Sequence, residues 1–213
     1  MQIVLLGPPG AGKGTQAKSL KSYFNLIHIS TGDLLRKAVS ENTKLGVEAK
    51  EFIERGDLVP DKLVIELINE RLSKPDVSRG FILDGFPRND SQADILDKML
   101  QKKNIILNYV VYLEASEEII IQRLSGRRVC RSCHENFHVK NMPTKVEGIC
   151  DICGGELYRR SDDQEEAIRN RLKIYTEKTE SLVDYYSSQE KLLKIDANFD
   201  APVVFEKLKS VLL

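Results

Sequence analysis

Five short apolar runs divide the chain into an alternation of strands and helices. They span residues 3–6, 26–29, 80–84, 109–113 and 192–195, and each has roughly the length of one strand. Short apolar runs separated by helical segments are typical of parallel strands that are covered on both faces. The pattern therefore predicts an α/β fold with a five-stranded parallel sheet, helices on both of its faces and right-handed crossovers.

The segments between these runs carry helix signals. Ser30 begins a helix-start sequence, residues 37–55 are mostly helical in composition, and Asp61 is expected to cap a helix whose apolar residues keep a helical period. Ser116 is expected to start another helix, because two glutamates follow it at the positive helix end. We also predict a long helix from about residue 163 to 185 and a helix over the last dozen residues.

A glycine-rich turn joins the first apolar run to the first helical segment, and it reads Gly7-Pro8-Pro9-Gly10-Ala11-Gly12-Lys13-Gly14-Thr15. This order of strand, turn and helix is that of a phosphate-binding P-loop. Glycines let backbone N–H groups point inward, and the helix N-terminus adds partial positive charge. Lys13 would reach the outer phosphates of a nucleotide. The usual pattern has Ser or Thr directly after the lysine, whereas here Gly14 intervenes before Thr15.

Composition narrows the class of protein. The 213 residues include 32 basic and 32 acidic side chains, so the formal net charge is zero. A general nucleic-acid-binding domain is usually basic, and we therefore expect no nucleic-acid partner. No apolar run approaches the length of a membrane span or of a secretory signal. We expect a cytoplasmic protein with no membrane partner.

All four cysteines lie in one segment as two Cys-x2-Cys pairs, Cys130 with Cys133 and Cys150 with Cys153. Sixteen residues separate the pairs, which fits a four-cysteine zinc ribbon. In a reducing compartment such clustering indicates a metal site rather than disulfides. Four thiolates fill a tetrahedral Zn²⁺ shell and leave no position for a catalytic water, so the predicted role of the metal is structural. The two histidines of the segment are not expected to be ligands.

Charged side chains near turns indicate phosphoryl chemistry. Asp84 ends the third apolar run, where a carboxylate of a P-loop fold can face the phosphates and hold Mg²⁺ or its water; the alternative is a turn-capping aspartate. Phosphoryl transfer needs two substrates in line and positive charge on the equatorial oxygens, which arginine supplies well. Six arginines lie next to turns or flank the cysteine segment: Arg36, Arg88, Arg123, Arg127, Arg160 and Arg171. The sequence lacks the Asn-Lys-x-Asp motif that reads guanine, which argues against a GTPase.

Five motifs cover residues 7–15, 30–36, 80–88, 126–130 and 160–163, and the first ends in Gly-Lys-Gly-Thr. In this order they resemble the adenylate kinase family, in the long-lid, zinc-containing form found mainly in bacteria. The resemblance extends over essentially the whole chain, and it accounts for Gly14, which the family has at this position.

The resemblance implies three parts within a P-loop NTPase-type fold. The core would comprise residues 1–29, 60–125 and 164–213. A helical insertion that binds the nucleoside monophosphate would comprise residues 30–59, and a zinc-stapled lid residues 126–163. Asp162 and Asp163 match a pair at the hinge of the lid. We expect a monomer.

The resemblance also implies two nucleotide sites and a reaction, the reversible transfer of the γ-phosphoryl group from Mg²⁺-ATP to AMP to give two ADP. The ATP site would comprise Gly10, Ala11, Gly12, Lys13, Gly14, Thr15, Arg123, Arg127, Asn136, Phe137 and Phe199. The AMP site would comprise Thr31, Arg36, Asp57, Leu58, Val59, Gly85, Phe86, Pro87, Arg88, Gln92, Arg160 and Arg171. The catalytic groups would be Lys13, Asp84, Arg88, Arg123, Arg160 and Arg171. Thr31 and Gln92 match the adenine contacts of AMP, and residues 197–201 depart from the family pattern around Phe199.

Three alternatives stay open at this point. Another nucleoside monophosphate kinase would accept UMP or CMP, because base choice rests on few contacts. A nucleic-acid-binding protein with a zinc ribbon and an ATPase loop is disfavoured by the neutral charge and by the few aromatic residues of the ribbon. A shikimate-type small-molecule kinase shares the P-loop, but the four-cysteine insertion argues against it.

Overall fold

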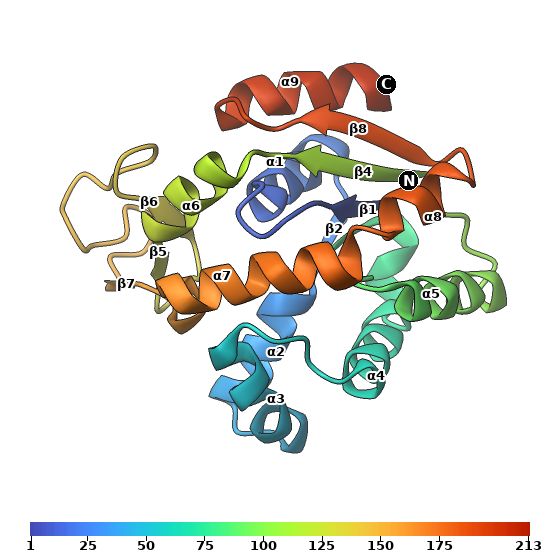
Figure 1. The fold of residues 1–213 in the computed structure, drawn as a ribbon, viewed down its shortest axis with the longest axis horizontal. Helices are drawn as coiled ribbons and strands as arrows, with labels where there is room; N and C mark the ends of the chain where they lie inside the picture. The colour runs from blue at the N-terminus through green and yellow to red at the C-terminus, as the bar shows by residue number, and fades with distance from the viewer.

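The computed structural model describes residues 1–213 and confirms the predicted parallel sheet (Figure 1). The strand order is β2-β3-β1-β4-β8, and all four pairings are parallel. The strands are β1 (Gln2–Leu6), β2 (Ile27–Ser30), β3 (Phe81–Asp84), β4 (Tyr109–Glu114) and β8 (Leu192–Asp196). Each of the five contains most of one predicted apolar run. The sheet therefore follows directly from the hydrophobic pattern.

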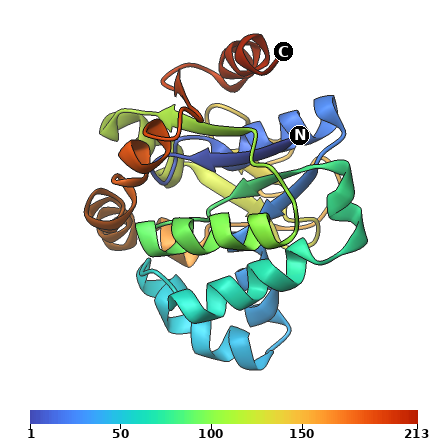
Figure 2. The same ribbon diagram turned by 90° about the vertical axis from the view of Figure 1, so that its right-hand side faces the viewer.

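Helices cover both faces of this sheet, and Figure 2 shows the C-terminal helix on one side and α4 and α5 on the other. The α-helices are α1 (Lys13–Phe24), α2 (Thr31–Ser40), α3 (Lys44–Arg55), α4 (Asp61–Leu72), α5 (Asp90–Lys102), α6 (Glu117–Ser125), α7 (Glu165–Ile174), α8 (Leu182–Ser187) and α9 (Ala201–Leu212). Short 3-10 helices span Pro75–Arg79 and Ser161–Asp163, and a π-helical turn spans Tyr175–Thr179. No helix combines the length and the apolar composition that crossing a bilayer needs.

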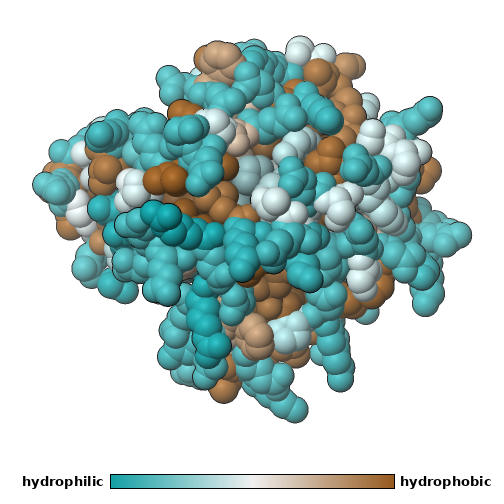
Figure 3. Space-filling view, in the orientation of Figure 1, coloured by the Kyte–Doolittle hydropathy of each residue, from teal (hydrophilic) through white to brown (hydrophobic).

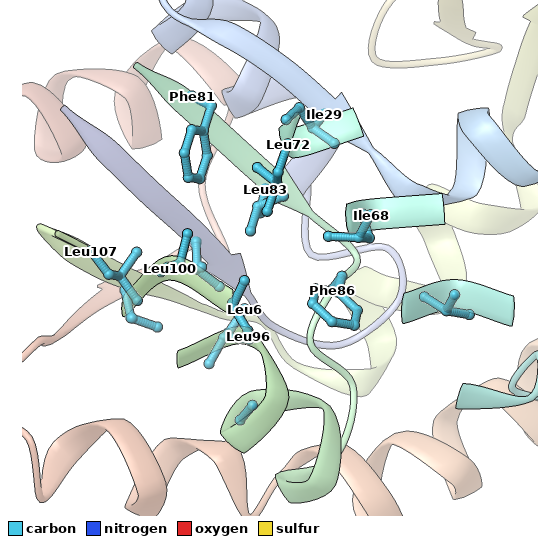
Figure 4. Close-up of a cluster of buried hydrophobic side chains, with 14 of the residues drawn as sticks. Leu6, Ile29, Ile68, Leu72, Phe81, Leu83, Phe86, Leu96, Leu100 and Leu107 are labelled. Atoms are coloured by element: carbon cyan, nitrogen blue, oxygen red, sulfur yellow. The ribbon is translucent and has the colours of Figure 1, made fainter. Parts of the chain in front are cut away.

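Alternate residues of each strand pack into two separate cores. Ile3 and Leu5 face the cluster formed with α1 and α9. Val4 and Leu6 face the larger cluster, formed with α4, α5 and α8, part of which Figure 4 shows around Phe86. Because both faces of the strands are buried, the runs are apolar at successive positions rather than at every second one.

The segment of residues 37–55 is mostly helical, as predicted, but it contains two helices: α2 ends at Ser40 and α3 begins at Lys44, because Asn42 takes a left-handed backbone (φ 51°) and the Thr43 side chain caps the second helix. Two local predictions were wrong in detail. Asp61 does not cap α4; it is the first helical residue, and its carboxylate binds side chains of α5 instead. The long C-terminal helix begins at Glu165 and is interrupted by the π-helical turn.

The cysteine segment forms a second, antiparallel sheet of order β6-β5-β7. Its strands are β5 (Arg127–Cys130), β6 (Asn136–His138) and β7 (Leu157–Tyr158). Figure 1 places this sheet at one end of the molecule and α2 with α3 at another, with α7 passing beside both. The only buried apolar cluster of the segment contains Cys130, Phe137 and Cys150, so its core is very small. The surface in Figure 3 is largely hydrophilic, with scattered apolar patches.

Candidate active site

The turn between β1 and α1 has the backbone that a phosphate cradle needs. Gly10 (φ 84°) and Gly12 (φ 97°) take left-handed conformations, and Gly12 occupies the N-cap of α1. A Cβ atom on Gly7 would lie 2.5 Å from the Leu113 carbonyl oxygen, so only glycine fits there. The ammonium group of Lys13 lies over the loop and donates to the carbonyl oxygens of Gly7 (2.6 Å) and Pro8 (2.9 Å).

One cavity of about 860 Å³ adjoins this loop and receives side chains from the main sheet, from α2 and α3, and from the small sheet. Every residue predicted for the two nucleotide sites lines it except Phe86. The Phe86 side chain is fully buried in the larger hydrophobic core, as Figure 4 shows, so only its backbone is available to a ligand. A cavity of this size matches a ligand-binding pocket for a molecule larger than one nucleoside monophosphate.

Several partly buried cations line the wall of this cavity. Burial lowers the pKa of Lys13 to about 8, and the pKa of Arg88 to about 10 with Arg171 as the second cause. Burial and the neighbouring Arg36 lower the pKa of Arg160 to about 10. Such shifts record cations that lack both water and sufficient counter-charge. An anionic ligand would relieve both deficits.

Acidic side chains compensate part of this charge. The Asp163 side chain is fully buried and accepts two hydrogen bonds from Arg127, from Nε at 2.7 Å and from Nη2 at 2.5 Å. Although burial lowers the pKa of Arg127, the Asp163 carboxylate outweighs it and raises that pKa. Arg171 lies 3.1 Å from Asp162 Oδ2 and 3.4 Å from Asp163 Oδ1. The aspartates expected at the lid hinge therefore bind the arginines expected in the active site.

Two further arginines connect separate elements. Arg123, near the end of α6, donates to the carbonyl oxygen of Ala11 at 3.4 Å and to that of Phe199 at 2.8 Å, and so joins the phosphate loop to the segment before α9. Arg88 donates from Nε to the Gly85 carbonyl oxygen at 2.9 Å. The Thr179 hydroxyl, in the π-helical turn, donates to the Arg88 carbonyl oxygen at 2.8 Å. The backbone of Arg88 is thus fixed from a helix distant in sequence.

Asp84 is placed where the sequence predicts a metal-facing carboxylate. It ends β3 beside the loop, and its Oδ2 atom lies 3.4 Å from the position a Cβ of Gly14 would take. The His28 imidazole approaches the same oxygen, with 3.3 Å between Nε2 and Oδ2. The primary structure does not indicate this contact, because it depends on β2 and β3 being neighbours in the sheet.

The four cysteines form one compact cluster, in which all four sulfur atoms lie within 4.8 Å of one another. Cys130 and Cys153 are 3.4 Å apart at sulfur, and Cys133 and Cys150 are 3.5 Å apart. A Zn²⁺ ion about 2.3 Å from each of four tetrahedral thiolates needs sulfur separations of about 3.8 Å, so the cluster fits the ion. The backbone N–H groups of Ser132 (3.4 Å) and Cys133 (3.5 Å) donate to the Cys130 sulfur, which stabilises a ligating thiolate there.

His138, also in this segment, is buried and makes hydrogen bonds to the backbone instead of belonging to the cluster. Its Nδ1 accepts from the N–H groups of Lys140 and Asn141, at 3.0 Å each. Its Nε2 therefore carries the proton and donates to the Gln122 carbonyl oxygen at 3.1 Å. Both ring nitrogens of His138 are thus occupied, which agrees with the expectation that this histidine is not a ligand.

Sequence reasoning missed several residues that shape the cavity. Asp33 binds Arg36 at 2.6 Å and lies 4.0 Å from Arg160. Asp61, at the start of α4, accepts a hydrogen bond from the Gln92 side chain, and Thr179, in the π-helical turn, donates one to the Arg88 carbonyl oxygen. The i,i+3 spacing of Asp33 and Arg36 within α2 is a signal that the sequence contains, whereas the partners of Asp61 and Thr179 lie on elements whose position the primary structure does not reveal.

Comparison with known proteins agrees with this geometry. The family model described as Adenylate kinase matches residues 5–191. A protein named Adenylate kinase from Carboxydothermus hydrogenoformans is 50% identical over 212 residues, covering 100% of this chain and 99% of its own length. Those from Syntrophobacter fumaroxidans (50% identical, 100% of both chains) and Clostridium novyi (46% identical, 99% of this chain and 97% of its own) are also similar. The five-stranded P-loop fold, the four-cysteine cluster and these full-length matches place the chain in the adenylate kinase family, as a member of its zinc-lid type.

Proposed function

We propose that the chain transfers the γ-phosphoryl group of ATP to AMP, reversibly, and gives two ADP. One observation carries the proposal: Lys13, Arg88, Arg160 and Arg171 lie partly buried around a single cavity, and loss of water is the first cause that lowers the pKa of each. Phosphate groups from two nucleotides would supply the missing negative charge. Membership of the adenylate kinase family supports this pair of substrates.

The donor end of the cavity suits ATP. Backbone N–H groups of the glycine-rich loop and the N-terminus of α1 would bind its phosphates, with Lys13 as the mobile cation. Arg123 and Arg127 would add charge from α6 and β5. The lid positions Asn136 and Phe137, and the backbone at Phe199, would enclose the nucleoside. All of these positions line the cavity, which supports the assignment.

The acceptor end suits AMP. Arg36 and Arg88 would hold the phosphate, and the backbone of residues 57–59 and 85–88 would line the sugar and base. Thr31 and Gln92 would contact adenine. The Thr31 hydroxyl is buried and has no hydrogen-bond partner within the protein, which supports a ligand contact there, since buried polar atoms are nearly always paired.

The chemistry follows from this placement. A phosphate oxygen of AMP would attack the γ-phosphorus as the bond to the β–γ bridging oxygen breaks, and that oxygen keeps the electron pair. No general base is needed, because the attacking oxygen is already anionic near neutral pH. Arg160 and Arg171, which line the same cavity, would lie between the two nucleotides and, with Lys13 and Arg123, would stabilise the charge on the transferring group.

Two metals fit the residues that are present. Mg²⁺ prefers a few carboxylate and phosphate oxygens together with water, and Asp84 beside the loop supplies such a carboxylate. Bound Mg²⁺ would neutralise charge on the ATP phosphates. Zn²⁺ would occupy the four-thiolate cluster and stabilise a segment whose own core is very small.

Two insertions would close over the substrates and exclude water, the competing nucleophile. We assign these roles to residues 30–59 and 126–163, since lid closure is a familiar property of adenylate kinases. Two contacts support a closed arrangement: Lys18 of α1 binds Glu135 of the lid at 2.6 Å, and Arg160 lies 4.0 Å from Asp33 of α2. The free thiols suit a reducing compartment, so we propose a cytoplasmic enzyme that acts as a monomer.

The test is ADP formation by the purified protein from Mg²⁺-ATP with AMP, UMP, CMP or GMP as acceptor, or with water alone. We expect a strong preference for AMP, with two ADP formed per ATP consumed. Preference for UMP or CMP would refute the assignment of Thr31 and Gln92 to adenine. ATP turnover on water alone would refute the phosphotransferase assignment.

A further inference from the structure

The side-chain amide of Gln92 is held in one orientation by two partners of opposite kind. Its Nε2 donates to Asp61 Oδ1 at 2.7 Å, and its Oε1 accepts from the backbone N–H of Arg88 at 2.8 Å. A carboxylate can only accept, and a backbone N–H can only donate. Rotating the amide by half a turn would therefore place oxygen against carboxylate and N–H against N–H.

Asp61 is itself fixed in place. Asn89 donates from Nδ2 to both carboxylate oxygens, at 3.1 Å and 3.2 Å, and its Oδ1 accepts from the Gln92 backbone N–H at 2.8 Å as the N-cap of α5. The three side chains thus form a closed network between the starts of α4 and α5. Asp61 therefore binds the side chains of Asn89 and Gln92 instead of capping α4, the role that its position in the sequence predicts.

The amide keeps unused hydrogen-bonding capacity for a ligand. A primary amide has two N–H donors and two acceptor lone pairs, and the network uses one of each. Gln92 lines the cavity, so one donor and one acceptor remain to read a base there. The other proposed base contact, Thr31, carries a hydroxyl that can rotate to donate or to accept, and so it cannot distinguish the two patterns.

We propose that Asp61 is a specificity-determining positioning residue, which makes the acceptor site accept adenine and reject 6-oxopurines. Adenine presents a donor at N6 beside an acceptor at N1, whereas hypoxanthine and guanine present an acceptor at O6 beside a donor at N1. The fixed amide of Gln92 complements the first pattern and opposes the second. If the amide could rotate, it would fit both. This inference rests on the proposed AMP site.

The test compares AMP with inosine monophosphate (IMP), which differs from AMP only at these two ring positions. Values of kcat and KM for both acceptors are measured with saturating Mg²⁺-ATP. The wild-type enzyme should favour AMP by about a thousand-fold or more in kcat/KM, because a mismatched base leaves buried polar groups unpaired. Wild-type enzyme that uses AMP and IMP equally well refutes the inference whether or not any variant folds, and wild-type enzyme that uses neither refutes the proposed function instead.

The decisive variant is Asp61→Asn, because an asparagine amide can face Gln92 with either its N–H or its oxygen. We expect the AMP/IMP ratio of kcat/KM to fall by about ten-fold, mainly through better use of IMP; the fall is limited because the Arg88 N–H still favours the wild-type orientation of the amide. Asp61→Ser, whose hydroxyl also donates or accepts, serves as a second variant if Asp61→Asn does not fold. The control is Asp94→Asn, which alters an exposed ion pair with Lys98 on α5, the helix that carries Gln92, and should leave the AMP/IMP ratio unchanged.

A double-mutant cycle with Gln92→Leu shows whether Asp61 affects specificity through the Gln92 amide or only stabilises the surrounding structure. Without the amide, Asp61→Asn should change the AMP/IMP ratio by less than about two-fold. A folded Asp61→Asn enzyme that loses activity toward AMP and IMP in equal proportion would overturn the inference, because Asp61 would then only support the structure. A ratio that changes equally in the presence and absence of the Gln92 amide would also overturn it.

Discussion

The buried ion pair between Asp163 and Arg127 provides a sharp test of how the lid is joined to the core. Asp163 ends the 3-10 helix before α7, and Arg127 begins β5, so the pair spans both connections of the small sheet. The carboxylate is fully buried, and its two oxygens each accept a hydrogen bond from Arg127. Arg171 approaches it at 3.4 Å. The perturbation we consider is Asp163→Asn, which keeps the shape and removes the charge.

The expected loss is large because two arginines lose their shared counter-ion. Removing one partner of a buried ion pair costs about 3–5 kcal/mol, since the remaining charge stays buried and uncompensated. Arg127 retains some exposure (20% of its side chain), and asparagine can still accept one hydrogen bond, which favours the lower end of that range. We therefore expect a decrease of about 3 kcal/mol in the free energy of unfolding, which for a chain of this length lowers Tm by roughly 10 °C.

The assay is urea and thermal unfolding followed by circular dichroism, with the same metal content in every sample. The matched control is Glu165→Gln, which removes an exposed ion pair with Arg169 four residues further along α7 and should cost less than about 0.5 kcal/mol. A folded Asp163→Asn protein that loses less than about 1 kcal/mol would refute the reasoning, because the pair would then be no more important than a surface ion pair.

Three further outcomes are expected. Chelation of the metal, or Cys150→Ser, should lower Tm more than it lowers the rate at low temperature, and metal analysis should find about one Zn²⁺ per chain; a rate collapse at unchanged Tm would contradict a structural role. Gly46→Ala should cost about 3 kcal/mol in urea unfolding, because a Cβ would lie 2.0 Å from the Ala38 carbonyl oxygen, whereas the neighbouring exposed Val47→Ala should be nearly neutral. Because burial lowers the pKa of Lys13 from 10.5 to about 8, the unfolded chain binds an extra proton between these values; stability should rise with pH across that range, and Lys13→Met should remove this part of the rise in thermal unfolding.

The main sheet, the glycine-rich loop and the cysteine cluster could be predicted because each depends on residues close together in the chain. The apolar run at β3 needs only its own composition to be recognised as a strand. The cysteine pairs likewise reveal their chemistry by spacing alone. The individual strands of the small sheet could not be predicted, because each has only two to four residues, which is too short for an alternation of apolar and polar positions to be recognised.

The contacts that tune the cavity could not be predicted, because they join elements whose arrangement is decided only in three dimensions. Asp61 has the position and residue type of a helix cap, yet its carboxylate finds donors 28 and 31 residues later in α5. His28 meets Asp84 because β2 pairs with β3, although 56 residues separate them. The break between α2 and α3 follows from the left-handed Asn42, a conformation that composition does not require.

The cations around the cavity have too few carboxylate partners, so an anionic ligand would stabilise their arrangement. Three aspartates each form an ion pair with a cation of the cavity: Asp163 with Arg127, Asp162 with Arg171, and Asp33 with Arg36. Lys13 and Arg88 have no carboxylate within ion-pair distance, and their pKa values are lowered. Asp84, at the end of β3, offsets only part of their charge, so net positive charge remains where the loop and β3 meet, which is where transferring phosphate would lie. Substrate phosphates would then relieve repulsion that the protein alone retains, and the same cations would be in place for the transition state without further rearrangement.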